Sequence, residues 1–495
     1  MQLTRILSGI VILVPGVGGA VAADPELRSV SMEDCVQQAI EHNLDIRIQR
    51  INPELARYTL GSSYGYYDPS LSFSSTENFS ASAGGIDAQG RQYPPTTIDG
   101  HSINAGLGGN LPYGGNLQIN HFIGETERNH ASSIFDSQGS VGVSMTQPLL
   151  RNLWIDQPRL LIQINKSTVK QRELGLKGQI MQTVSDVHTA YYNLIAAREN
   201  VKVQQTALDL AEQLYKENKK RVEVGVLAPL DEKQAQSQVA ASKAALLVAQ
   251  GSATSAENTL KSLITDKYSE LQNVSLQPSE PLNAVAQTFS RQDSWQKGLT
   301  MRPELLTQKL TLDQNKITVR YNYNQLFPEL DVRGSYQLAG VGEEFPDALN
   351  GIVVGNSPGW SFTASVTVPL SNRSARYNYK GAKATVQQSL LTLKKIEEGI
   401  MVQIDNDINQ AQTSLERVEA TRQARLYAEA ALDAEQKKLD SGKSTSFLVL
   451  QAQRDLTQRK SDEIGALTDY NNALVQLALH EGSTLDLYHI KVETK

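Results

Sequence analysis

The stretch IMQTVSDVHTAYYNLIAARENVKVQQTALDLAEQLYKENKKRVEVG, Ile180–Gly225, decides the fold. It has no proline and is rich in Ala, Leu, Gln, Glu, Lys and Arg, which all favour helix. The run Gln157–Val224 around it has no proline after Pro158, and at about 1.5 Å per residue it forms a helix on the order of 100 Å long. Apolar residues recur every seven positions: Ile180, Val187, Leu194, Val201, Leu208, Tyr215 and Val222. This period predicts helices that supercoil side by side rather than wrap around a globular core.

A second helix must lie beside this one. Small residues at Ala190, Ala197 and Ala211 would let it approach closely. The long helix is interrupted at Gly225, and residues 230–264 are a further helical stretch without proline. We therefore expect an antiparallel helical hairpin with its tip near Gly225.

Matching markers recur along the chain at nearly constant offsets, which indicates an internal duplication. The markers are Leu44 and Pro303, Pro69 and Pro328, Pro148 and Pro369, and Gly225 and Gly442. The first two pairs are 259 positions apart, the third 221 and the fourth 217. The second helical hairpin is therefore expected to turn at Gly442. The shrinking offset assigns about 38 extra residues to the first half, between Pro69 and Pro148.

The N-terminus has the features of a secretory signal peptide. Arg5 precedes the apolar run Ile6–Val14, and Ala20, Val21 and Ala22 form a small-residue cleavage site. Nine apolar residues are too few to span a bilayer as a helix. The expected organisation is a signal peptide (1–22), a first repeat (23–265), a linker (266–287), a second repeat (288–482) and a C-terminal tail (483–495).

Short segments between the helices alternate apolar and polar residues with period two. The apolar members include Val141, Val143 and Met145 in the first repeat and Trp360, Phe362 and Val366 in the second. Such alternation fits a tilted transmembrane strand with lipid on one side and water on the other. Taken alone, the alternation is more typical of a soluble β-sandwich with one buried face than of transmembrane strands. The export signal, and the position of the strands at the ends of thin helical rods, favour the membrane, with these six residues on the lipid face of a β-barrel.

The extra segment of the first half suggests an additional hairpin. Residues 102–111 and 116–123 can pair across a turn at Pro112–Gly115, and long polar stretches at 80–100 and 124–138 are expected as loops. Our hypothesis is four strands in the first half and two in the second, six per chain. The alternative is a surface flap above a two-stranded pair.

Composition excludes several function classes. The formal net charge is −6, and removal of Arg5 with the signal peptide makes it −7, which does not favour nucleic-acid binding. Cys35 is the only cysteine, so no intrachain disulfide can form. The seven histidines are scattered without metal-ligand spacing, and Gly106–Gly109 does not precede a helix as a phosphate-binding loop would. We expect no catalytic residue, no metal and no cofactor, and we do not expect an enzyme.

The ordered set of features resembles the TolC-like outer membrane efflux protein family. The resemblance extends from about Ser31 to Gly482. It is carried by the duplication, by the Asn43–Ile46 and Arg302–Leu305 openings, by Pro148 and Pro369 at the strand ends, and by the tip pattern Gly225–Asp231 with Ala235. The second tip keeps Gly442 and Ala452 but has Leu448 at the aspartate position.

The resemblance implies a mainly α fold with membrane β-structure. Long antiparallel coiled-coil helices from the two-fold repeat would form an α-barrel, and β-hairpins would form a trimeric transmembrane β-barrel in the outer membrane with a periplasmic extension. It implies an export duct of a tripartite efflux or type I secretion system. The partners would be a periplasmic adaptor (membrane fusion) protein and an inner-membrane pump. By position, the docking and entrance residues are Val222, Gly225, Leu230, Asp231, Leu439, Gly442 and Phe447.

Other interpretations remain open at this stage. Asp231 is either a pore-facing acid that selects cations or a charge stabilised by the dipole of its helix. Lys219, Lys220 and Arg221 form either a solvated helix end or an adaptor contact. The chain as a whole could also be a periplasmic coiled-coil scaffold, an adhesin or an adaptor. A scaffold would have no membrane strands, and an adaptor would need a compact β-rich domain.

Overall fold

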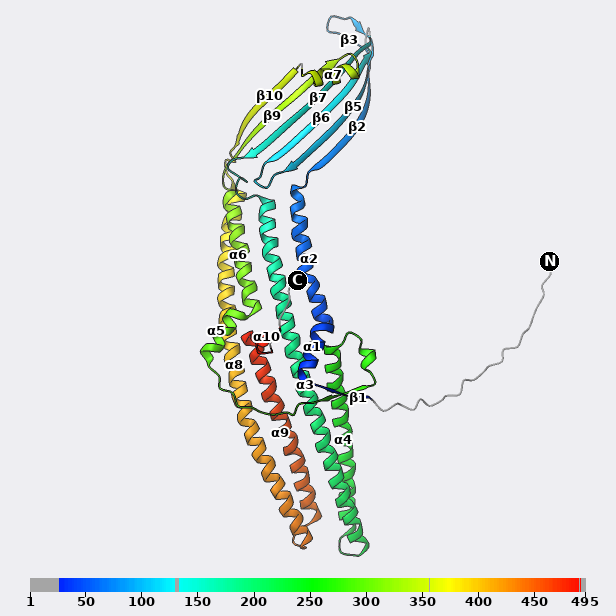
Figure 1. Cartoon of the computed structure of the whole chain (residues 1–495), viewed down its shortest axis with the longest axis vertical. Helices are drawn as coiled ribbons and strands as arrows, with labels where there is room; N and C mark the ends of the chain where they lie inside the picture. The colour runs from blue at the N-terminus through cyan, green and yellow to red at the C-terminus, as the bar shows by residue number, and fades with distance from the viewer. Residues whose placement is uncertain (1–25, 130–132, 356, 489, 491–495) are drawn as a thin grey trace, which may run out of the picture. The chain divides into compact units, whose positions relative to one another are not determined.

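The computed structural model describes residues 26–129, 133–355, 357–488 and 490 (Figure 1). The predicted signal peptide lies outside this range. The chain divides into two compact units, each built from three segments. Unit 1 contains 1–43, 187–283 and 421–468, and unit 2 contains 44–186, 284–420 and 469–495.

The helices follow the predicted pattern, and the two longest have 67 and 68 residues. They are α1 (Met32–His42), α2 (Leu44–Tyr64), α3 (Gln157–Glu223), α4 (Pro229–Ile264), α5 (Arg291–Met301), α6 (Pro303–Asn324), α7 (Phe345–Val354), α8 (Arg373–Asp440), α9 (Ser446–Glu481) and α10 (Thr484–Leu487).

The strands are mostly long. They are β1 (Glu26–Val30), β2 (Ser70–Ser82), β3 (Gly85–Ile86), β4 (Gln92–Tyr93), β5 (Thr96–Asn110), β6 (Asn116–Asn129), β7 (Ser133–Pro148), β8 (Val274–Pro278), β9 (Glu329–Gly342) and β10 (Ser357–Thr367). The element order of the first half, with a helix pair, a strand region, a very long helix and a half-length helix, returns in the second half.

Unit 1 contains the parts of the two helical hairpins that are next to their turns, α3 with α4 over residues 187–264 and α8 with α9 over residues 421–468. A cluster of buried side chains, Leu214, Leu439, Val449 and Leu450, joins the two hairpins. Each turn has a glycine in the left-handed region, Gly225 at φ 75° and Gly442 at φ 68°, which an L-residue with a Cβ rarely adopts. Both predicted tips are therefore confirmed as turns. Beside the hairpins, β1 and β8 pair in parallel.

Unit 2 contains a six-stranded antiparallel sheet with the strand order β10-β9-β7-β6-β5-β2. The hypothesis of six strands per chain is confirmed, because β5 and β6 lie between β2 and β7 in this sheet rather than in a flap. The polar stretches expected as long loops are largely paired strand instead: β2 runs to Ser82 and β6 runs to Asn129. Main-chain pairing continues there because it does not depend on apolar side chains.

The connection between a strand of the sheet and the long helix that follows contains an asparagine with positive φ in both repeats. Asn152 follows β7 and Asn372 follows β10, and both have positive φ, 67° and 40°. Asparagine tolerates this region better than most residues. Asn324 at the end of α6 accepts a hydrogen bond from the Asn152 backbone N–H (2.7 Å), and the Asn372 side chain donates to the carbonyl of Leu326 (3.3 Å). These contacts fix the direction in which each helix leaves the sheet.

Below the sheet, unit 2 has a core of its own. Leu305 of α6, Leu477 of α9 and three isoleucines of α8 form a buried cluster, and Trp295 of α5 packs against it. The Trp295 indole N–H donates to Asp405 Oδ1 at 3.2 Å. The shorter helices thus hold the long helix α8 in place.

Candidate transport pathway and contact surfaces

The sheet has one mainly apolar and one mainly polar face. Residues that pair across antiparallel strands point to the same side, so the register assigns rows of side chains to each face. One row crosses all six strands with apolar side chains only: Leu71, Leu107, Ile119, Val143, Tyr336 and Trp360. A continuous row of this kind is what a lipid-facing surface requires.

The opposite face is polar at the same depth. Its neighbouring row is Ser70, Gly108, Gln118, Ser144, Ser335 and Ser361. The hydroxyls of Ser335 and Ser361 lie 2.7 Å apart and form a hydrogen bond across the two strands. Such a face can remain in contact with water.

The predicted lipid-face residues lie on the apolar face. Their side chains are exposed in the single chain for Val143 (40%), Met145 (39%), Trp360 (80%), Phe362 (68%) and Val366 (65%), whereas Val141 is half-buried. The structure therefore brings these residues from two distant segments onto one surface. Their contact with lipid stays a prediction.

The sheet ends in two strands that each pair on one side only. Among the described residues β2 pairs with β5 alone and β10 with β9 alone. The free N–H and C=O groups of these edges need partners, because an unpaired edge inside lipid leaves costly unsatisfied groups. A neighbouring chain could supply them.

The tip of the first helical hairpin exposes apolar side chains. The Gly225 N–H donates to the carbonyl of Val222 (2.9 Å), and the Val226 N–H donates to the carbonyl of Arg221 (2.8 Å), which closes the turn. Val224, Val226 and Leu230 are 73%, 70% and 64% exposed. Val224 and Val226 were not among the individually predicted contact residues, although apolar residues on both sides of a turn glycine are a signal for them.

The predicted acid at this tip, Asp231, lies in the first turn of α4, where Pro229 begins the helix and Glu232 follows. Its backbone N–H donates to the carbonyl of Ala228 (3.0 Å), and Asp231 is half-buried. An acid at this position is stabilised by the helix dipole whether or not it also meets a transported ion.

The second tip has the same main-chain pattern but different side chains. The Gly442 N–H donates to the carbonyl of Leu439 (3.1 Å), and the Lys443 N–H donates to the carbonyl of Lys438 (2.8 Å). Phe447 is 53% exposed and Leu448 43%.

Leu439 requires a correction. Its side chain is 5% exposed and packs with Leu214, Val449 and Leu450. The structure therefore contradicts its assignment as a docking residue, because its side chain points into the cluster that joins the hairpins.

Polar contacts also join the two hairpin ends. The Ser446 hydroxyl donates to Asn218 Oδ1 (2.9 Å), where both residues are buried, and Arg221 lies 3.7 Å from Asp440. Arg221 therefore takes part in an ion pair within the chain. A movement that separates the hairpins would have to break both contacts.

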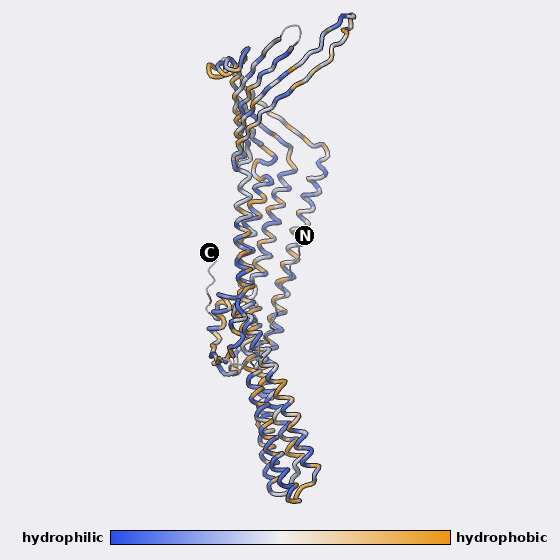
Figure 2. Tube along the Cα trace, turned by 90° about the vertical axis from the view of Figure 1, so that its right-hand side faces the viewer, coloured by the Kyte–Doolittle hydropathy of each residue, from blue (hydrophilic) through white to orange (hydrophobic). Residues whose placement is uncertain are grey.

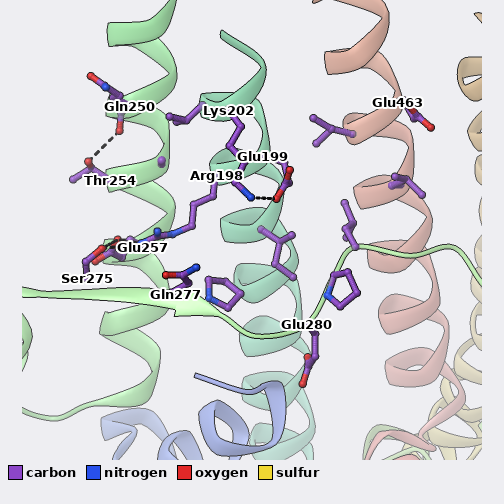
Figure 3. A pocket seen from close by; sticks show the side chains of 18 residues that line it. Arg198, Glu199, Lys202, Gln250, Thr254, Glu257, Ser275, Gln277, Glu280 and Glu463 are labelled. Carbon is purple, nitrogen blue, oxygen red and sulfur yellow. Dashed lines mark hydrogen bonds and ion pairs between the residues drawn. The ribbon is translucent and has the colours of Figure 1, made fainter. Parts of the chain in front are cut away.

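A groove of about 1020 Å³ lies between α3, α4, α9 and the segment that follows β8 (Figure 3). Its cations are neutralised within the chain: Arg198 lies 2.9 Å from Glu257, and Lys202 lies 2.7 Å from Glu199. Glu257 also pairs with the buried Lys261 (2.8 Å). The groove thus offers no free cluster of one charge, and the Arg198–Glu257 ion pair links α3 with α4.

The titratable groups in this unit do not form a reactive site. Burial raises the pKa of Cys35 to about 12, with Asp34 and Glu280 acting in the same direction, so the thiolate does not form at neutral pH. Burial lowers the pKa of His188 to about 4, so this imidazole is neutral. Within the described ranges, no three His, Cys, Asp or Glu side chains come together in a way that could hold a metal ion.

None of the helices in the described part of the chain combines the length and the apolar character needed to cross a membrane.

The sequence matches the model of the outer membrane efflux protein family over residues 35–265 and 295–483. The chain belongs to the outer membrane efflux protein family. An outer membrane location and a role as an efflux channel follow from this membership, and the two matched ranges each contain one long helical hairpin and strands of the sheet.

Several individual proteins are similar to this chain at low sequence identity. The outer membrane protein TolC of Vibrio cholerae serotype O1 is 22% identical over 348 residues, which cover 68% of this chain and 75% of that protein. A membrane protein from Pseudomonas aeruginosa superposes with a TM-score of 0.67 at 18% identity, covering 91% of this chain and 92% of its own. The Campylobacter jejuni CmeC outer membrane channel superposes with a TM-score of 0.65 at 16% identity, covering 92% and 86%. These likenesses show that the chain has the fold of TolC-like channels.

Proposed function

We propose that three copies of this chain join at their sheet edges and form one closed transmembrane β-barrel. The observation that carries the proposal is the six-stranded sheet with one apolar face, one polar face and two unpaired edges. Three such sheets give eighteen strands, and closure would pair β2 of one copy with β10 of the next. The number of copies comes from the resemblance to TolC-like proteins.

In this assembly the apolar face would meet lipid and the polar face would line the lumen. Side chains such as Ser335, Ser361 and Gln337 would then form a hydrated polar wall, with the charged Asp331 and Arg333 on the same face of β9. A wall of this kind fits a passive conduit that discriminates little between solutes. We assign the protein no catalytic activity, no metal and no cofactor.

The long helices of the three copies would form a periplasmic tunnel, and the chain would be a duct of a tripartite efflux or type I secretion system. It would reach the outer membrane through Sec after removal of residues 1–22. The two family matches support repeats at 23–265 and 288–482, joined by 266–287 and followed by the tail 483–495. The inner-membrane pump would choose the cargo.

The hairpin tips would face a periplasmic adaptor protein. The exposed apolar residues Val224, Val226, Leu230 and Phe447 support this contact, with Val222, Asp231 and the turn glycines Gly225 and Gly442 beside them. Opening of the entrance would separate the hairpins at the contacts Ser446–Asn218 and Arg221–Asp440. This is a change of packing rather than chemistry.

The first test is the native mass of the detergent-extracted protein and its conductance in a planar bilayer. We expect a trimer that conducts. Single cysteines introduced along β2 and β10 in a Cys35→Ala background should give chain-to-chain disulfides only when one is in each strand. A monomer without conductance would contradict the duct and favour a periplasmic coiled-coil scaffold or adaptor.

A second test separates the two cargo classes. A deletion strain that becomes sensitive to small toxic compounds would indicate tripartite efflux, and one that loses a secreted protein would indicate type I secretion.

A third test concerns opening at the hairpin tips. The substitution Ser446→Ala, which removes a hairpin contact, should raise conductance, and Ser444→Ala at the same tip is its control.

A further inference from the structure

The short helix α7, which joins β9 to β10, lies on the apolar face of the sheet. Three glycines allow it to come this close. A methyl group at Gly340 would overlap the carbonyl oxygen of Ala348, and one at Gly139 would lie 2.7 Å from Cδ1 of Ile352. A methyl group at Gly342 would likewise overlap Asp347. The helix therefore packs directly on the strand backbone.

The register identifies the face that α7 covers. Side chains alternate along a strand, so Gly139 shares a face with Val143, and Gly340 shares a face with Tyr336. Val143 and Tyr336 are paired members of the apolar row. Helix α7 thus lies on the same side of the sheet as the predicted lipid-facing residues.

Helix α7 lies at the end of the sheet that is remote from the long helices of unit 2 (Figure 1). Strand β9 begins at Glu329, after α6, and ends at Gly342, just before α7. From Tyr336 to Gly340 the strand rises by about 13 Å at about 3.3 Å per residue. The helix therefore lies beyond the Tyr336 row, where the outer boundary of the membrane would be.

The outer side of α7 is apolar and uncovered. Ala348 and Ile352 are buried against the sheet, whereas Leu349, Val353 and Val354 are 39%, 84% and 61% exposed. Figure 2 shows hydrophobic residues on this segment at the end of the sheet. A short helix with one side packed and the other apolar side exposed needs a nonpolar environment beyond it.

We propose that α7 is an interfacial helix that inserts Leu349, Val353 and Val354 into the outer leaflet of the membrane. The proposal rests on the barrel of the proposed function and adds a lipid contact outside the strands. The occupant is lipid because Val141 and Leu338, a pair between the Val143–Tyr336 pair and the helix, keep the same face apolar on β7 and β9. Acidic residues at its N-terminal end, Glu344 and Asp347, suit the water side of such a boundary.

A second copy of the chain does not fit this position. In the assembly, neighbouring copies meet at β2 and β10, whereas α7 packs on β9, on β7 and beside Ile123 of β6, which lie inside the sheet. Neighbouring copies would therefore meet at the edge strands of the sheet and would not lie above β6, β7 and β9.

Spin labels on single cysteines test the proposal in the full-length protein reconstituted in liposomes, in a Cys35→Ala background. The test site is Val353→Cys. Its side chain is 84% exposed, so the label does not disturb packing. Phe362→Cys is the control for the apolar face of the sheet, and Ser361→Cys is the control for the polar face. The measurement is the collision rate of each label with oxygen, which concentrates in lipid, and with a water-soluble nickel complex.

We expect position 353 to behave like position 362, with oxygen collisions exceeding nickel collisions, and position 361 to show the reverse. If 353 behaves like 361 while 362 lies in lipid, the helix proposal is overturned and the barrel stands. If 362 itself prefers the nickel complex, the lipid face is wrong, and the placement of α7 falls with it.

Discussion

The sheet of unit 2 and the helical hairpins of unit 1 both expose apolar side chains, but in different patterns. In the sheet, exposed residues such as Leu71, Phe73, Trp360 and Phe362 belong to rows that continue from strand to strand. In the hairpins, apolar residues are gathered in a buried cluster around Leu214. Exposed apolar residues lie at the tips and in two isolated pairs elsewhere, Leu247 with Val248 and Leu426 with Tyr427. This contrast indicates that the hairpins are stabilised by contacts within the chain, whereas the stability of the sheet depends on the medium around it.

The substitution Leu214→Ala tests the hairpin side of this comparison and should have the largest effect. It empties part of the cluster with Leu439, Val449 and Leu450, and truncation of a buried leucine costs about 2–5 kcal/mol. The measurement is thermal unfolding in detergent followed by far-UV circular dichroism. Leu230→Ala, at a side chain 64% exposed, is the control and should change stability by less than about 0.5 kcal/mol. Equal losses for the two variants would show that the cluster is not a core.

Two neighbouring residues of β10 test the sheet side. In liposomes, Trp360→Arg should destabilise the protein by about 2–4 kcal/mol, because a cation would enter the lipid. Ser361→Arg, on the polar face, should cost about 1 kcal/mol through loss of its hydrogen bond to Ser335. The readout is the urea concentration at which the reconstituted protein unfolds. A larger loss for Ser361→Arg would reverse the assignment of the faces.

The pH dependence of stability tests whether the interior of the helical hairpins excludes water around His188. Burial lowers the pKa of His188 from 6.5 to about 4, so its neutral form is favoured in the folded state. This contribution to stability is complete above pH about 6.5 and is lost as pH falls towards about 4, where the loss is about 2–3 kcal/mol. The melting temperature of the wild type should therefore drop more than that of His188→Gln over this range. Parallel pH profiles would mean that His188 is hydrated.

The turn glycines should give the smallest effect. Gly225→Ala and Gly442→Ala place a Cβ at positive φ without any steric contact within 4 Å, so each should cost about 1 kcal/mol from backbone strain alone. Gly251→Ala in α4 also meets nothing within 4 Å, but its backbone is helical, so it should stabilise by about 0.4–1 kcal/mol. Melting temperatures that shift in the same direction for all three variants would contradict this explanation of the turns.

The sequence was sufficient where a local rule governs the structure. The seven-residue period and the turn glycines predicted α3 and α8 and the positions of both tips, because helix packing and helix termination depend on nearby residues. The period-two alternation and the turn at Gly114 predicted the added hairpin of β5 and β6, and Gly114 has φ 89°.

Other features depended on distant contacts and were missed. Helix α7 was not predicted, because it is short, contains Gly351 and is stabilised by glycines of β7 and β9. Leu439 was assigned to docking and the entrance by its position near the turn at Gly442, and its burial was missed. It also continues the apolar series of α8 at seven-residue spacing, and this signal correctly indicated burial.

The added hairpin shows how such a sheet can be enlarged in evolution. Strands β5 and β6 enter between β2 and β7, which run in opposite directions, and two further strands leave that opposition intact. A single inserted strand would reverse the direction of every later strand in the sheet. The helices that follow those strands in the chain would then begin at the wrong end of the sheet. A sheet of this kind therefore gains strands in pairs, one hairpin at a time. The helical part keeps its apolar seam in phase without a change of winding when it lengthens by whole heptads. The sheet and the helices therefore differ in the insertions that they tolerate best.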